Sequence, residues 1–112
     1  MQKILQRFAP AAFFITLTIF VLPVVVRAQS DAAKVFKNNC TLCHGPDGSG
    51  NTPTGKALKA KDLNSDEVQK QSDDELTAVI SKGRAKMPAF GSKFSPDIIK
   101  SLVAYIRQLP KK

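Results

Sequence analysis

Cysteine, histidine and tryptophan are almost absent from this chain. Its 112 residues include two cysteines, one histidine, one tyrosine and no tryptophan. A zinc site takes three or four protein ligands, and the three Cys and His residues here all lie together, which excludes zinc. The lysines are scattered with no aromatic residues among them to stack on bases, so nucleic acid is not an expected partner.

Both cysteines and the single histidine lie in one pentapeptide, Cys40-Thr41-Leu42-Cys43-His44. The pattern C-x-x-C-H is the attachment site of a c-type haem. The two thiols add across the vinyl groups as thioethers, and His44 binds the iron as the proximal ligand. A dithiol redox pair would need a βαβ context, which the sequence lacks, and a structural disulfide is the other alternative. The spacing therefore predicts one covalently bound haem c per chain.

The N-terminal segment differs in composition from the rest. Lys3 and Arg7 precede a long apolar run that ends shortly before Ala28. This pattern is typical of a secretory signal peptide, although the run is also long enough to span a bilayer as a retained anchor. We expect residues 1–28 to be a signal peptide, with retention as the alternative, and residues 29–112 to form one monohaem domain. The domain would lie outside the cytoplasm, in the periplasm or a comparable compartment.

Basic side chains outnumber acidic ones. The formal net charge is +8, and removal of the three basic residues of the leader would lower it to +5. A positive surface steers encounters with acidic proteins. We expect a monomer that meets acidic redox partners and touches a membrane only if the N-terminal segment is retained.

Apolar residues beyond the leader recur with helical periodicity, and no segment shows strand alternation. Ser30, Ser72 and Ser95 are suited to N-capping, and Ser65 opens a shorter segment. The predicted helices run over residues 31–39, 65–69, 73–82 and 96–109. The intervening residues 45–62 are rich in Gly, Pro, Ser and Thr and indicate a long loop. The predicted fold class is all-α, with three to four helices around one haem.

Met87 is the candidate for the second axial ligand. The domain has no second histidine, and Met87 is its one methionine because Met1 belongs to the leader. A thioether sulfur favours reduced iron and raises the potential, and Pro88 stiffens the adjacent backbone. The alternatives are a core methionine without a ligand role, a lysine ligand, or an open sixth position.

The sequence resembles the class I c-type cytochromes over essentially all of residues 29–112. Besides the C-x-x-C-H motif, it has the stretch Met-Pro-Ala-Phe from Met87 to Phe90 and a C-terminal Leu-Val-Ala-Tyr-Ile-Arg. The Met-Pro-Ala-Phe form is similar to the small bacterial and photosynthetic members. The resemblance implies that the first and last helices cross. The residues at the family's contact positions are Ala32, Phe36, Leu102 and Tyr105.

The resemblance also implies a loop proline whose carbonyl orients the proximal histidine. Pro53 is the better candidate and Pro46 the weaker. The family's buried tryptophan has no counterpart here, and Lys61 and Asn64 are candidates for the neighbourhood of the haem propionates.

These features predict a one-electron carrier rather than an enzyme. Four basic residues flank Met87 and are candidates for docking an acidic partner: Lys82, Arg84, Lys86 and Lys93. The alternatives are a haem sensor or peroxidase with an open iron site, and an anchored haem subunit of a respiratory or dehydrogenase complex.

Overall fold

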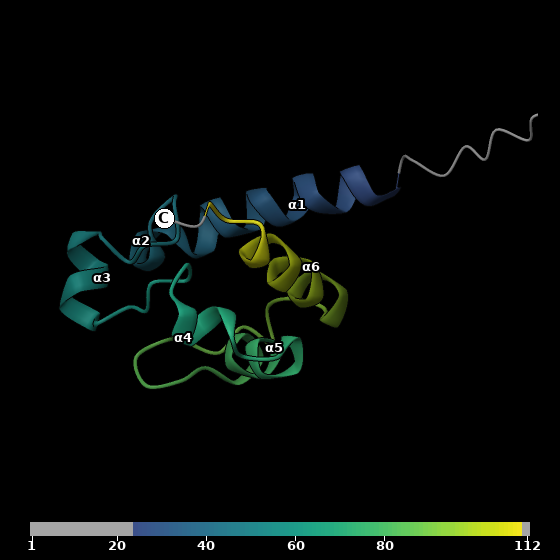
Figure 1. Ribbon diagram of the computed structural model, residues 1–112. Helices are drawn as coiled ribbons and strands as arrows, with labels where there is room; N and C mark the ends of the chain where they lie inside the picture. Colours follow the sequence, from purple (N-terminus) through teal and green to yellow (C-terminus); the bar gives the residue numbers. More distant parts are fainter. Residues whose placement is uncertain (1–23, 111–112) are drawn as a thin grey trace, which may run out of the picture.

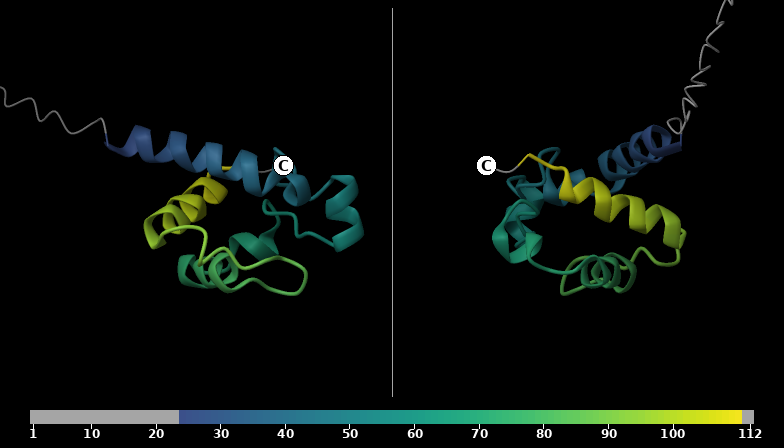
Figure 2. Two further views of the ribbon diagram at one scale, coloured as in Figure 1. Left: turned by 180° about the vertical axis from the view of Figure 1, so that it is seen from behind. Right: turned by 45° about the vertical axis from the view of Figure 1, so that its right-hand side comes forward.

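Helices follow one another along the part of the chain that the computed structural model describes, residues 24–110. They are α1 (Val24–Asn39), α2 (Thr41–His44), α3 (Pro53–Leu58), α4 (Asp66–Gln69), α5 (Asp73–Lys82) and α6 (Pro96–Arg107). Helix α1 crosses α6, and α5 lies on the other side of α6 (Figures 1 and 2). Within this range there is no strand, only an isolated bridge between Arg84 and Met87. The all-helical fold class is confirmed.

Helix α1 begins earlier than the sequence suggested. It starts at Val24, so Ser30 lies inside the helix and is not its N-cap. No proline or glycine interrupts residues 24–39, so nothing in the local sequence stops the helix from extending upstream. The predicted cleavage position after Ala28 therefore falls within α1, and most of the predicted signal peptide lies outside the described residues. No helix within residues 24–110 is long and apolar enough to cross a membrane.

The crossing of α1 and α6 is made by the residues that the resemblance assigned to it. Ala32, Phe36 and Leu102 are each exposed by 2% or less. The Phe36 and Tyr105 rings lie 5.1 Å apart between centroids, at a tilt of 50°. Tilted aromatic pairs at this separation add attraction beyond the area they bury. The predicted crossing of the first and last helices is therefore confirmed.

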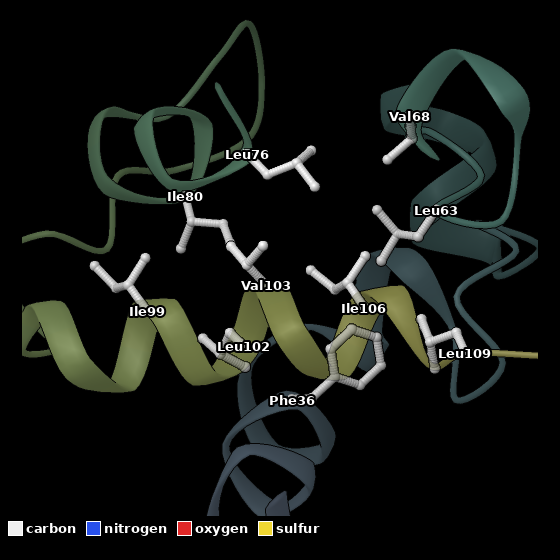
Figure 3. Close-up of a cluster of buried hydrophobic side chains, with 10 residues drawn as sticks. All are labelled: Phe36, Leu63, Val68, Leu76, Ile80, Ile99, Leu102, Val103, Ile106 and Leu109. Carbon is white, nitrogen blue, oxygen red and sulfur yellow. The ribbon is translucent and has the colours of Figure 1, made fainter. Parts of the chain in front are cut away.

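Helix α6 has a second apolar face toward α5. Ile99, Val103 and Ile106 project from α6 toward Leu76 and Ile80 of α5 (Figure 3). The cluster also holds Phe36 and Leu102 at the crossing and Leu63, Val68 and Leu109 beside α4. The spacing of three and four residues along α6 places these side chains on adjoining faces of one helix. Helix α6 thus joins the two sides of the molecule.

Serine caps fix where the later helices begin. The Ser72 hydroxyl accepts from the Glu75 amide, and the Glu75 carboxylate accepts from the Ser72 amide, which completes the predicted capping box. Ser95 caps α6 in the same manner, with Pro96 at the first helical position. Ser65 caps α4 as predicted.

The predicted loop over residues 45–62 contains a helix. Thr52 caps α3, whose first residue is Pro53, and the αL conformation of Lys59 ends it. A capping threonine followed by proline is a helix-start signal, which the high content of small and polar residues obscured. The segment therefore has a defined shape and is not a structureless connection.

We expect Phe36→Ala to lower the free energy of unfolding of the haem-bound protein by about 3–5 kcal/mol, because it leaves a cavity between α1 and α6. Denaturant titration followed by circular dichroism measures this value. Ile98→Ala is the control, since that side chain is 38% exposed and we expect its loss to cost well under half as much. Equal losses for the two variants would contradict the assigned crossing.

Candidate haem site

The C-x-x-C-H segment forms a helical turn directly after α1. Cys40 precedes α2, and its carbonyl accepts from the amides of Cys43, at 3.2 Å, and His44, at 2.9 Å. The Cys40 amide in turn donates to the Phe36 carbonyl at 2.9 Å, which continues the hydrogen bonding of α1. Both thiols are free and half-buried. The position of the motif is thus set by the end of α1.

The segment after the motif folds back over it. The Gly50 amide donates to the His44 carbonyl at 2.7 Å. The Thr52 hydroxyl donates to the Leu42 carbonyl at 2.7 Å and accepts from the Gly55 amide at 2.8 Å. Thr52 therefore serves two helices, because it caps α3 and also satisfies a carbonyl of α2.

Glycine is required at residue 55 by this close approach. A Cβ there would collide with the carbonyl oxygens of Cys43 and Gly50. Gly55 is buried within α3, a position where glycine costs about 1 kcal/mol relative to alanine. The cost is offset by the contact that it permits between α3 and the haem motif.

The His44 ring is oriented by a backbone carbonyl. Its Nδ1 lies 3.0 Å from the Lys61 carbonyl oxygen. A carbonyl can only accept, so Nδ1 carries the proton and the lone pair of Nε2 is left for a metal. Burial lowers the pKa of His44, and the hydrogen bond to Lys61 opposes that shift. The imidazole is thus held in its neutral form, which is the form that binds iron.

The expectation for Pro53 is corrected by this hydrogen bond. Pro53 is the first residue of α3, so its carbonyl belongs to the hydrogen-bonding pattern of that helix. The acceptor at His44 is instead eight residues further along, at Lys61. Every residue type supplies a backbone carbonyl, so no feature of the sequence distinguishes residue 61 as the acceptor.

The Cys40 thiol lies in partly buried, weakly polar surroundings. Burial raises the pKa of Cys40 to about 11, with the neighbouring Cys43 adding to the rise and Lys93 opposing it. A buried, protonated thiol is a weak metal ligand and a weak nucleophile at neutral pH. This setting suits a cysteine that becomes a thioether better than one that cycles as a redox thiolate.

Met87 lies in a tight turn after α5. Arg84 and Met87 exchange backbone hydrogen bonds at 2.9 and 3.2 Å, so residues 84–87 form a β-turn. Gly83, which ends α5 just before the turn, has φ +75°, and Ala85 within the turn has φ +52°, which is rare for a residue with a side chain. The Phe90 amide donates to the Ile80 carbonyl at 2.9 Å and ties the turn back to α5.

His44 and Met87 line the same cavity, which holds about 350 Å³. The walls are mostly apolar, and they include Cys40, Cys43, Phe36, Leu102 and Ile106. An apolar cavity with two soft or neutral donors and two cysteines in its wall matches the chemistry of a haem bound through thioethers. The residues present therefore fit the group that the motif predicts.

The four basic residues chosen from the sequence divide into two sets. Arg84 and Lys86 line the cavity at its rim, as do Lys59 and Lys61. Lys82 ends α5 and does not line the cavity, while the Lys93 ammonium donates to Asn39 Oδ1 at 2.7 Å. Lys61 forms an ion pair with Glu67 at 2.8 Å, and Asn64 donates to the Asp47 carbonyl.

A family model described as "Cytochrome C oxidase, cbb3-type, subunit III" matches residues 27–106. Cytochrome c6 of Synechococcus sp. is 34% identical over 98 residues, which cover 86% of this chain and 84% of that relative. The chain belongs to the c-type cytochromes. The resemblance drawn from the sequence is thereby confirmed, and the cofactor of this cytochrome is haem c.

Two further relatives show how widely this cytochrome domain is used. The FixP subunit of the cbb3-type cytochrome c oxidase of Azorhizobium caulinodans is 38% identical over 85 residues. Those residues are 73% of this cytochrome but only 27% of FixP, so the chain spans about a quarter of that relative. The solved structure of the KustC0563 c-type cytochrome superposes with a TM-score of 0.66 at 34% identity, covering 72% of this chain and 99% of that one.

We expect Thr52→Ala to lower the free energy of unfolding of the haem-bound cytochrome by about 1–2 kcal/mol, because it removes a helix cap and leaves the Leu42 carbonyl without its donor. Thr52→Ser keeps the hydroxyl and is the matched control, for which we expect less than half that loss. Guanidinium titration at neutral pH measures both values. If serine fails to restore stability, the hydroxyl is not the group that matters.

Proposed function

We propose that this cytochrome carries single electrons between redox proteins outside the cytoplasm, with one haem joined covalently to Cys40 and Cys43 and bound axially by His44 and Met87. The observation that carries the proposal is the placement of all four residues around one apolar cavity. The cytochrome c6 relatives, matched over most of their length, support a carrier.

When bound, haem c supplies an iron that gains or loses one electron. The protein contributes a fixed set of ligands in a mostly apolar cavity. His44 is held by the Lys61 carbonyl, and the Met87 turn is tied to α5 at Phe90. Ligands that stay in place in both oxidation states keep the reorganisation on electron transfer small.

An apolar spot beside the cavity mouth suits a transient partner. Leu42 lies between the two cysteines and is 71% exposed, and Leu58 is 37% exposed. Both line the cavity, and the basic side chains of Arg84 and Lys86 lie on the same rim. Apolar contact at the centre with cations around it favours a brief complex with an acidic protein.

An anchored subunit is the second candidate function. FixP is a subunit of a cbb3-type oxidase, and α1 here continues upstream through the predicted cleavage position toward the apolar N-terminal segment. A retained segment would make the redox partner permanent without changing the chemistry at the haem. The mass of the exported protein, with or without residues 1–28, separates the two candidates.

We expect the purified protein to keep its haem through acid–organic extraction and to show a low-spin spectrum with the weak far-red sulfur-to-iron band when oxidised. Met87→Ala should lose that band, become high-spin and bind carbon monoxide when reduced, because the iron loses its sixth ligand. The reduction potential of the haem should fall as well. Optical spectra and redox titration measure these changes.

Ile98→Ala is the control for this experiment, because Ile98 does not line the cavity and the spectrum of this variant should match the wild type. A high-spin, carbon monoxide-binding wild type would instead favour the sensor or peroxidase alternative. Haem lost on extraction would contradict covalent attachment.

We expect Arg84→Gln and Lys86→Gln together to slow electron transfer to an acidic redox protein by about threefold to tenfold at low salt, because the rim loses two charges. The difference should shrink as ionic strength rises, since salt screens the attraction. Stopped-flow mixing measures the rates. Lys34→Gln with Lys70→Gln removes the same charge from other exposed positions and should change little; an equal effect would indicate net charge rather than this rim.

A further inference from the structure

Lys93 makes a contact that a docking residue does not need. Its ammonium donates to Asn39 Oδ1 at 2.7 Å, across 54 residues of sequence. Asn39 is the last residue of α1 and precedes Cys40. The contact therefore joins the segment that follows Met87 to the helix end from which the haem motif begins.

The Asn39 amide is held in a fixed orientation. Its Nδ2 donates to the Val35 carbonyl at 2.8 Å, one turn back along α1. That bond leaves Oδ1 directed away from the helix axis and available to a donor. Asn39 is also half-buried, which limits the rotamers open to it. The acceptor is already fixed, and the lysine side chain is long and flexible. The conformational entropy lost in forming the hydrogen bond is therefore mainly that of the Lys93 side chain.

On its other side, Lys93 belongs to a turn over residues 90–94, which begins three residues after Met87. The amides of Lys93 and Phe94 both donate to the Phe90 carbonyl, at 3.0 and 2.9 Å. The rings of Phe90 and Phe94 stack at 5.4 Å between centroids, and the Lys93 ammonium lies 5.6 Å from the centre of the Phe94 ring. Both rings line the haem cavity.

We propose that the Lys93–Asn39 hydrogen bond is a latch that closes the haem cavity between the end of α1 and the Met87 segment. In this role Lys93 is a positioning residue, and its charge is engaged within the molecule. The latch resists excursions of residues 87–94 away from Cys40. It thereby limits how often Met87 leaves the iron and how often an external ligand replaces it. The proposal rests on Met87 being the distal ligand.

The test is the rate at which imidazole binds the ferric protein, because imidazole can bind only when Met87 has moved away. We expect Lys93→Ala and Asn39→Ala each to raise this rate by about threefold to tenfold, the strength of one exposed charge-assisted hydrogen bond. The two effects should be less than additive in the double variant, since both single variants remove the Lys93–Asn39 contact. Stopped-flow spectroscopy measures the rates.

Two further variants keep the result specific. Lys93→Arg retains a donor and should stay near the wild-type rate. Lys100→Ala removes one exposed charge from α6 and should have no effect. Because a general loss of stability would also speed binding, the midpoint of denaturant unfolding is measured for each variant. The rate change should persist in variants whose midpoint equals that of the wild type.

Rates for Lys93→Ala and Asn39→Ala equal to the wild-type rate would overturn the latch, as would additive effects in the double variant. Failure of the underlying ligand assignment has a different signature. In that case the wild type itself lacks the far-red band and binds imidazole rapidly, and all variants behave alike.

Discussion

The packing of Phe36 against α6 fixes the place from which the haem site is built. Phe36 is fully buried at the crossing, and its carbonyl accepts from the Cys40 amide. One backbone hydrogen bond therefore links the position of Cys40 to the crossing of α1 and α6. Helix α6 also carries the face that packs on α5, and α5 holds the turn that bears Met87. Both proposed axial ligands thus depend on the same helix, through two adjoining faces.

The two ligand-bearing segments are held by different means. On the His44 side, residues 50–61 wrap the motif with backbone and hydroxyl hydrogen bonds, and Gly55 lets the two backbones touch. On the Met87 side, a single β-turn with one positive-φ alanine is tied at its ends, and the proposed latch adds a side-chain contact. The His44 side chain is therefore held by a hydrogen bond of its own, while the position of Met87 is set by the backbone bonds of its turn and by the proposed latch. This difference makes the methionine side the place where ligand exchange would begin.

Much of this arrangement could be predicted from the sequence, for reasons that differ between residues. Cys40, Cys43 and His44 are adjacent and chemically distinctive, and the periodicity of α6 with its serine cap and proline gave its location. The start of α1 was wrong because Ser30 is an adequate cap but also tolerable inside a helix. Helix α3 was not predicted, because its start signal at Thr52 and Pro53 lies within a segment whose glycine and proline content indicates a loop. The role of Lys61 could not be seen, because it is played by a main-chain atom that carries no residue identity.

A main-chain acceptor for His44 has a consequence for how this site can change. A substitution at residue 61 changes the side chain but leaves the backbone carbonyl in place. It can therefore alter the charge at the cavity rim without removing the hydrogen bond that orients His44. The orientation of the imidazole is sensitive to chain length, since one residue inserted or deleted between Gly55 and Lys61 would shift the carbonyl out of reach. The hydrogen bond to His44 thus depends on the number of residues in this segment. The charge at the cavity rim depends on side chains and can change independently of that bond.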